Sequence, residues 1–256
     1  MPRLSPRPVA VTGIRSPLVS LDGSWKFNSQ PPDGFEKFSA AQTNSWAKIQ
    51  VPGEWVMQGF EVAVNSAAAY WREFQIPADW KGKRIKLRFN TVHSDCRVFV
   101  NGREVGAHEG CFTAFELDVT DAVKPGGNTL ALTVKNESTA DVIASATQYA
   151  AHQLGGITRK VQIFALPETN VASQILTTTF DKAFKDAELD IHLDIANEST
   201  LDGAVVTRFQ LMDTAGKVVF NETRPVAAVP AGQWVAAEFS IPVPAPMKWD
   251  SEHPYL

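Results

Sequence analysis

The segment from residue 70 to residue 120 limits the fold of this chain more than any other part of the sequence. Within it, residues 85–89 alternate apolar and polar side chains, which is the period of a half-buried β-strand. The short apolar run 98–100 is followed by Asn101-Gly102, and both residues tolerate the positive φ angles that a type I′ turn requires. The sequence therefore predicts a β-hairpin at this point.

The alternation of predicted strands and turns continues beyond the hairpin. Residues 129–134 alternate again, directly after Pro125-Gly126-Gly127-Asn128, in which every residue favours a turn. No apolar pattern with the period of a helix extends through this part of the chain. Many short strands separated by turn signals are typical of an antiparallel sandwich or jelly roll. We therefore expect an all-β fold that begins with a jelly-roll sandwich.

A second all-β unit is predicted in the last third of the chain. Residues 187–195 alternate almost without interruption, and residues 233–241 form another candidate strand. Two further runs, 205–212 and 217–220, flank Asp213-Thr214-Ala215-Gly216, which is a candidate hairpin loop. Strands of this length and spacing are typical of an immunoglobulin-like sandwich.

These patterns predict a lead-in segment at 1–20, a first domain at 21–168, a short connector at 168–172 and a second domain at 173–256. We count five or so strands in the second domain, whereas immunoglobulin-like sandwiches carry about seven. We therefore expect this sandwich to be incomplete and to leave an unpaired sheet edge.

Composition excludes several classes of protein. The chain has 256 residues, a hydrophobic content of 44% and a net charge of −4, which suits packed globular domains. Acidic and basic residues are mixed and no basic stripe occurs, so nucleic acid is not an expected partner. No apolar run approaches the roughly 20 residues that a membrane-spanning helix needs. No signal peptide is visible, and the sequence leaves a periplasmic, secreted or cytoplasmic location open.

The two cysteines, Cys96 and Cys111, lie on either side of the predicted hairpin. We expect two free, partly buried thiols, with a disulfide as the alternative. Neither cysteine lies in a Cys-x-x-Cys or histidine-rich context, so the sequence predicts no metal site there and no cofactor.

Five segments, taken in order, carry a resemblance to a known family. They are residues 21–27, 46–60, 70–120, 155–161 and Leu166-Pro167. Together they resemble the N-terminal sugar-binding domain of glycoside hydrolase family 2, which includes β-galactosidases, β-glucuronidases and β-mannosidases. Residues 249–256 resemble the Trp-x-x-Glu-x-Pro-x-Leu segment of the immunoglobulin-like domain that follows it in the family. There this segment leads into another strand, so the resemblance implies a piece of a longer enzyme.

The resemblance also implies where the chemistry lies. Family 2 enzymes are retaining glycosidases that hydrolyse O-glycosyl bonds, and both catalytic glutamates lie in a (β/α)₈ barrel. This sequence shows no strand–helix repeats, so we expect a non-catalytic portion that braces the barrel and forms one wall of the sugar pocket. We expect no catalytic residue in this chain and no activity from it alone. The resemblance leaves open whether the whole enzyme binds a metal ion, and the sequence identifies no ligands for one.

Four residues are candidates for contact with a carbohydrate substrate. Residues 62–65 resemble the surroundings of an asparagine that touches the sugar in some β-galactosidases, which makes Asn65 a candidate; the alternative is a turn-forming loop asparagine. The same enzymes carry an aspartate before Gly-Ile-x-Arg, but residues 148–154 contain no acid, which counts against galactose specificity. His152 and Gln153 offer polar contacts there instead, or take structural roles.

Tryptophan rings can stack on sugar rings, so the tryptophans are further candidates for sugar contact. Trp25, Trp46 and Trp55 lie in segments that resemble the family core, so we expect them to be buried. The sequence determines the location of Trp71 and Trp80 less clearly, and Trp71 is the fourth candidate for sugar contact.

Two alternatives to a glycosidase portion stay open at this point: a free-standing carbohydrate-binding module, and a structural or adhesive pair of β-sandwiches that binds protein.

Overall fold

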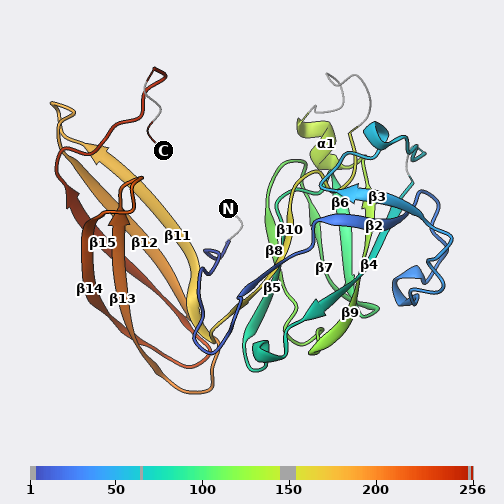
Figure 1. Ribbon diagram of the computed structural model, residues 1–256, viewed down its shortest axis with the longest axis horizontal. Helices are drawn as coiled ribbons and strands as arrows, with labels where there is room; N and C mark the ends of the chain where they lie inside the picture. The colour runs from blue at the N-terminus through green and yellow to red at the C-terminus, as the bar shows by residue number, and fades with distance from the viewer. Residues whose placement is uncertain (1–3, 64–65, 145–153, 253–254, 256) are drawn as a thin grey trace. The chain divides into compact units, whose positions relative to one another are not determined.

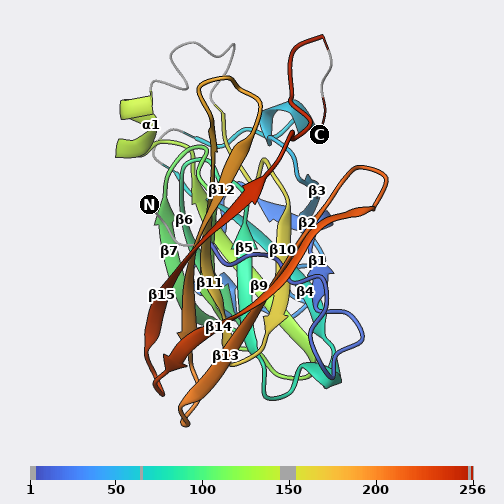
Figure 2. The same cartoon turned by 90° about the vertical axis from the view of Figure 1, so that its left-hand side faces the viewer.

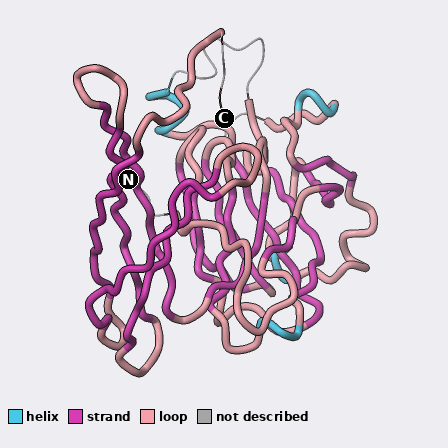
Figure 3. Tube along the Cα trace, turned by 60° about the vertical axis from the view of Figure 1, so that its left-hand side comes forward, coloured by secondary structure: helices cyan, strands magenta, loops and turns pink. Residues whose placement is uncertain are grey.

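The structure is a computed structural model, and it describes residues 4–63, 66–144, 154–252 and 255. The chain divides into two compact units, Met1–Pro167 and Glu168–Leu256. Both units are built almost wholly from antiparallel strands (Figure 1), and the helices of the described part are short (Figure 3). The all-β prediction is confirmed.

Unit 1 is a sandwich of two antiparallel sheets. The six-stranded sheet has the order β3 (Ala47–Val51), β2 (Gly23–Asn28), β4 (Ala68–Ile76), β9 (Gly126–Lys135), β6 (Asp95–Val100) and β7 (Arg103–Glu109). The four-stranded sheet has the order β1 (Leu18–Ser20), β10 (Val161–Leu166), β5 (Arg84–Phe89) and β8 (Phe115–Asp118). Short helical segments connect the strands: η1 (Phe35–Lys37), η2 (Val56–Gln58), η3 (Ala78–Trp80) and α1 (Thr139–Ala144).

Aromatic side chains fill the space between these two sheets. The ring centroids of Phe27 and Tyr70 lie 5.0 Å apart and those of Trp25 and Tyr70 lie 6.3 Å apart, both with the edge-to-face geometry that aromatic quadrupoles favour. The indole nitrogen of Trp25 donates to the Leu21 carbonyl at 2.9 Å, so burial leaves it satisfied. Trp55 belongs to the same cluster. The prediction that Trp25, Trp46 and Trp55 are core residues is confirmed.

The hairpin predicted at Asn101-Gly102 joins β6 to β7. Asn101 and Gly102 have φ angles of 50° and 77°, which are the left-handed values that a type I′ turn requires. The Asn101 side chain also donates to the Ala122 carbonyl and to Asn128 Oδ1, each at 2.8 Å. This asparagine therefore serves the turn through its backbone and the neighbouring loop through its amide.

The lead-in segment is more ordered than the sequence suggests. Residues 18–20 form β1, which pairs with β10. Further back, the Arg88 guanidinium donates to both the Ser5 carbonyl and Glu116 Oε1, and Ser5 N donates to Glu116 Oε2 at 3.1 Å. Because a guanidinium has several donors in a fixed plane, one buried arginine can hold a loop and a carboxylate together. This arrangement fastens the lead-in to the four-stranded sheet.

Unit 2 contains a three-stranded sheet and a two-stranded sheet in its described residues. The first has the order β11 (Thr169–Phe180), β12 (Ala187–Asn197) and β15 (Trp234–Val243); the second is the long hairpin of β13 (Gly203–Met212) and β14 (Val218–Val229), visible in Figures 1 and 2. The hairpin loop predicted at 213–216 is present, and Gly216 has a φ of 79°. The connector expected at 168–172 differs, because Thr169 already pairs with Asn197.

Asp118 at the end of β8 gathers three hydrogen-bonding partners. Its Oδ2 lies 2.6 Å from Arg84 and 2.8 Å from Lys86, and its Oδ1 accepts from Thr120 N at 3.0 Å. Partial burial on its own would raise the pKa of this carboxyl, but the hydrogen bonds from Lys86 and Thr120 and the charge of Lys86 outweigh it and lower the pKa to about 2. The ionised form of Asp118 therefore stabilises the folded state more than the protonated form does.

We predict that Asp118→Asn lowers the free energy of unfolding by about 1 kcal/mol at neutral pH, a value reduced for partial solvent exposure. Since the folded pKa lies below the unfolded value of about 3.9, this contribution is present above about pH 4 and is lost as the pH falls through the folded value. Urea unfolding followed by tryptophan fluorescence at several pH values measures it. Asp121→Asn, on an exposed side chain, is the control. A gap between wild type and Asp118→Asn that persists unchanged below pH 2 would contradict the assignment.

Gly155 and Gly156 pass directly over two buried aromatic rings. A Cβ on Gly155 would lie 2.1 Å from Cζ2 of Trp55, and one on Gly156 would lie 2.5 Å from the Tyr70 hydroxyl. Trp55 N also donates to the Gly155 carbonyl at 3.1 Å. The glycine pair in Gly-Gly-Ile-Thr-Arg thus allows a contact between backbone and ring that no other residue permits.

We predict that Gly155→Ala destabilises unit 1 by about 1–3 kcal/mol, because the added methyl group meets a rigid ring in a filled core. Gly127→Ala is the matched control, since its Cβ would have only Gln75 nearby, at 3.6 Å. Thermal unfolding monitored by fluorescence gives both values. Equal stability of the two variants would show that Trp55 can move aside.

Candidate functional site

Three of the four residues predicted to contact substrate lie outside the described residues. They are Asn65, His152 and Gln153, and they belong to the stretches 64–65 and 145–153. The structure therefore leaves their sugar contacts as predictions. Residues next to both stretches are described, and they show what shapes this part of unit 1.

The fourth candidate, Trp71, is buried on the side of β4 opposite the main core. It is 2% exposed and belongs to a small cluster with Phe35, Trp46, Ala69 and Ala131. Neither face of its ring is open to solvent, so stacking on a sugar would require this cluster to open. Its substrate contact also stays a prediction, and the described packing gives it a structural role. Trp80 is likewise buried, with its indole nitrogen donating to the Ser16 carbonyl at 2.9 Å.

Glu54 connects the loop after β3 to the segment that follows the undescribed stretch 145–153. Its Oε1 accepts from Gly155 N at 3.2 Å and its Oε2 accepts from Met57 N at 2.8 Å. Nearby, Gly53 N donates to the Ile157 carbonyl at 2.9 Å. The carboxylate thus holds the loop after β3 against the start of the Gly-Gly segment.

His93 lies in the loop after β5 and its backbone is fixed on both sides. His93 N donates to the Gly156 carbonyl at 2.9 Å, and Gly156 N donates to the His93 carbonyl at 3.1 Å. The imidazole is fully buried, and its Nε2 lies 3.1 Å from Oδ1 of Asp141 on α1. A histidine and a carboxylate from distant parts of the sequence therefore meet beside the Gly-Gly segment. Figure 1 places α1 at one end of the unit 1 sandwich.

Cys111, in the loop between β7 and β8, completes this group. One donor atom each from His93, Cys111 and Asp141 lies within 4.8 Å of the others, and all three residues are buried. Burial raises the pKa of the Cys111 thiol, and the carboxylates of Asp141 and Glu109 raise it further. Cys96 and Cys111 are both free, as predicted. The sequence did not predict the group, because nothing in the spacing of its members relates them.

The nearby side chain of Tyr70 is fully buried. Burial raises its pKa well above the usual range for a tyrosine. Its ring packs between Trp25 and Phe27 and its hydroxyl approaches Gly156. Tyr70 is therefore a packing residue that shapes the loop.

Acids that could serve a glycosidase are used structurally in unit 1. Glu109 Oε1 accepts from Ala140 N at 3.0 Å, Glu116 pairs with Arg88, and Glu54 joins two loops as described above. Each of these carboxylates satisfies backbone or arginine donors.

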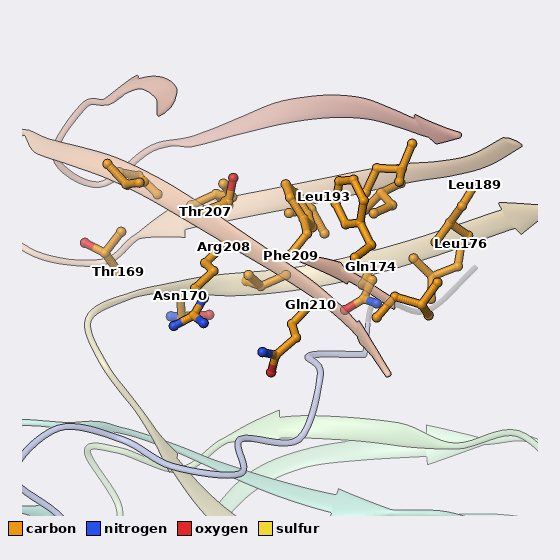
Figure 4. Close-up of a pocket in the computed structure, with 18 residues that line it drawn as sticks. Thr169, Asn170, Gln174, Leu176, Leu189, Leu193, Thr207, Arg208, Phe209 and Gln210 are labelled. Carbon is orange, nitrogen blue, oxygen red and sulfur yellow. The ribbon is translucent and has the colours of Figure 1, made fainter. Parts of the chain in front are cut away.

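Unit 2 contains a pocket of about 490 Å³ between its two sheets (Figure 4). Leu193 and Ile241 line it from one sheet and Phe209 from the other. It is also lined by polar residues, which are Asn170, Gln174, Arg208 and Gln210. All four residues predicted to contact a sugar belong to unit 1, so we place the candidate site at the loops of unit 1. In the described part of the chain, no helix is long and apolar enough to span a membrane.

Sequence comparison assigns both units to one family. Residues 18–167 match the model of the glycosyl hydrolases family 2 sugar-binding domain, and residues 169–256 match the next domain model of glycosyl hydrolases family 2. A β-galactosidase of Priestia megaterium is 27% identical over 93% of this chain and 25% of its own length. A β-galactosidase of Clostridium acetobutylicum is 28% identical over 70% of this chain and 23% of its own length. The chain thus spans about a quarter of the length of these relatives.

Solved structures show the same fold. A family 2 glycosyl hydrolase from Bacteroides cellulosilyticus has a TM-score of 0.79 at 24% identity, covering 93% of this chain and 33% of its own. A β-glucuronidase from glycoside hydrolase family 2 has a TM-score of 0.80 at 20% identity, covering 94% of this chain and 28% of its own. Consecutive matches to the two domain models cover nearly every residue from 18 to 256, and the chain therefore belongs to glycoside hydrolase family 2.

Proposed function

We propose that this chain is the non-catalytic N-terminal portion of a retaining, β-galactosidase-like glycoside hydrolase. In that role it braces a (β/α)₈ catalytic domain and forms one wall of the sugar pocket. One observation carries the proposal: the two family domains follow one another in this chain, which spans about a quarter of the β-galactosidases it resembles.

Retaining hydrolysis supports a catalytic centre elsewhere in the enzyme. The mechanism needs two carboxyl groups about 5–5.5 Å apart, one as acid and one as nucleophile. In unit 1, Glu54 is engaged by two loop amides, Glu109 by the amide of Ala140, and Glu116 by Arg88. Carboxylates bonded in this way hold the scaffold together. The two carboxyl groups that must face the substrate therefore come from another domain in this proposal.

The wall of the sugar pocket is proposed at the loops around Asn65 and residues 148–154. The described segment that follows residue 154 is held by hydrogen bonds, because Glu54 and Trp55 bond to Gly155 and His93 bonds to Gly156. An asparagine amide offers a donor and an acceptor to a sugar hydroxyl, and His152 and Gln153 are the other polar residues proposed to face the substrate. Loops on a rigid sandwich are where such contacts are usually placed.

The first test compares this chain with the whole enzyme. We predict that the purified 256-residue chain does not release nitrophenol from 4-nitrophenyl β-galactoside above the buffer rate, whereas the protein that also carries the catalytic domain does. Glu109→Gln in the chain controls for trace activity that a carboxylate of its own would cause.

Three outcomes of this test and of a parallel sugar titration separate the functions. Turnover by the chain that Glu109→Gln abolishes would overturn the proposal. Galactose binding by the chain with a dissociation constant in the micromolar range, without any active longer protein, would indicate a free-standing binding module. Absence of turnover and of sugar binding, with a defined protein partner, would indicate a structural sandwich.

The second test addresses Asn65 in the active whole enzyme. We predict that Asn65→Ala lowers kcat/KM for the nitrophenyl galactoside by about tenfold, the loss expected when one hydrogen bond of about 1.4 kcal/mol disappears. Asn44→Ala, on an exposed loop of unit 1, is the matched control. Equal kcat/KM for both variants would remove Asn65 from the pocket wall.

A further inference from the structure

We propose that His93, Cys111 and Asp141 bind a divalent metal ion of the zinc class, which joins two loops and helix α1 at one end of unit 1. The donor atoms of the three residues lie within 4.8 Å of one another and come from separate segments of the chain. This inference stands independently of the proposed glycosidase function, because it concerns only the described residues of unit 1.

The spacing of the donors suits a small ion. His93 Nε2 and Asp141 Oδ1 are 3.1 Å apart. Two ligands of a tetrahedral zinc ion, at bond lengths of about 2.0–2.2 Å, are separated by roughly 3.3–3.5 Å. A shift of a few tenths of an ångström is therefore sufficient to place an ion between this pair. Cys111 Sγ lies within 4.8 Å of the donor atoms of both other residues.

The backbone holds each of these segments in place without any ion. Both peptide groups of His93 pair with Gly156, and Ser94 N donates to the Lys135 carbonyl at 2.8 Å. The Cys111 loop is tied to the same segment, because Gly110 N donates to the Ser94 carbonyl at 2.8 Å. Asp141 N donates to Ser138 Oγ at 3.2 Å at the start of α1. Such preorganisation lowers the cost of assembling a binding site.

The other imidazole nitrogen of His93 lacks a partner in the described part of the chain. The imidazole is fully buried, and its Nδ1 has no hydrogen-bond partner among the described residues. An unsatisfied buried polar atom costs about 1–3 kcal/mol, so most such atoms have a partner. An ion between Nε2 and Asp141 would use the lone pair of Nε2 and would leave the proton of the neutral ring on Nδ1. Nδ1 would still lack a described partner, so the three clustered donor atoms carry the proposal.

The donor types identify the class of ion. Imidazole nitrogen and thiolate sulfur favour Zn²⁺ or Co²⁺, whereas Mg²⁺ and Ca²⁺ prefer oxygen ligands throughout. The Phe112 ring lies 5.6 Å from the His93 ring and shields one side of the group. Binding would replace the thiol proton of Cys111 by the metal and release that proton to solvent. The ion would fasten α1 and the loop between β7 and β8 to the strand framework.

Cobalt provides a direct test on the purified, chelator-treated protein. We expect one equivalent of Co²⁺ to produce the near-ultraviolet charge-transfer absorption of a cobalt–thiolate bond, and Zn²⁺ to abolish it. Cys111→Ser should lose the absorption, and Asp141→Asn should weaken binding by about 10- to 100-fold. The control Cys96→Ser changes the other buried cysteine and should retain both absorption and affinity. Circular dichroism verifies that each variant is folded.

A measurement on the unaltered protein covers the case in which a variant fails to fold. Alkylation by iodoacetamide, read by peptide mass spectrometry, should become at least tenfold slower at Cys111 when Zn²⁺ is present. Two results would overturn the proposal: cobalt absorption that survives Cys111→Ser, or wild-type protein with no cobalt–thiolate absorption and an unchanged rate of Cys111 alkylation.

Discussion

The contact of Trp55 with the Gly155–Gly156 backbone fixes the end of unit 1 on which any functional role depends. The ring occupies the space where a Gly155 side chain would be, and the Trp55 amide donates to the Gly155 carbonyl. Gly156 in turn pairs with His93, so one buried indole sets the position of several loops. A sandwich core that holds its loops in this way provides the rigid support that a binding wall requires.

Features encoded by neighbouring residues could be predicted from the sequence. The Asn101-Gly102 turn needs only two residues with positive φ, and the alternation of β12 and β13 needs only one buried face. Burial of Trp25 and Trp55 followed from their place in segments typical of the family. The connector at 168–172 was predicted wrongly, because the pairing of Thr169 with Asn197 depends on a strand far along the chain.

Features that depend on distant residues could not be predicted. His93 and Cys111 lie in two loops and Asp141 lies on α1, and only the sheet topology brings their donor atoms together. Alternation places Trp71 on one face of β4, but the sequence does not show that η1 and Trp46 cover that face. The order of the lead-in depends on Arg88, whose partners Ser5 and Glu116 lie 111 residues apart in the sequence. The positions proposed for Asn65, His152 and Gln153 lie outside the described residues.

We propose that this chain supplies shape and support, whereas another domain of the enzyme cleaves the glycosidic bond. A 2-deoxy-2-fluoro-β-galactosyl fluoride tests this division most directly, because a retaining enzyme forms a covalent adduct with its nucleophile. Peptide mass spectrometry of the labelled whole enzyme should place the adduct outside residues 1–256, and the intact mass of this chain alone should stay unchanged. A glycosyl adduct on any aspartate or glutamate of this chain would contradict the account.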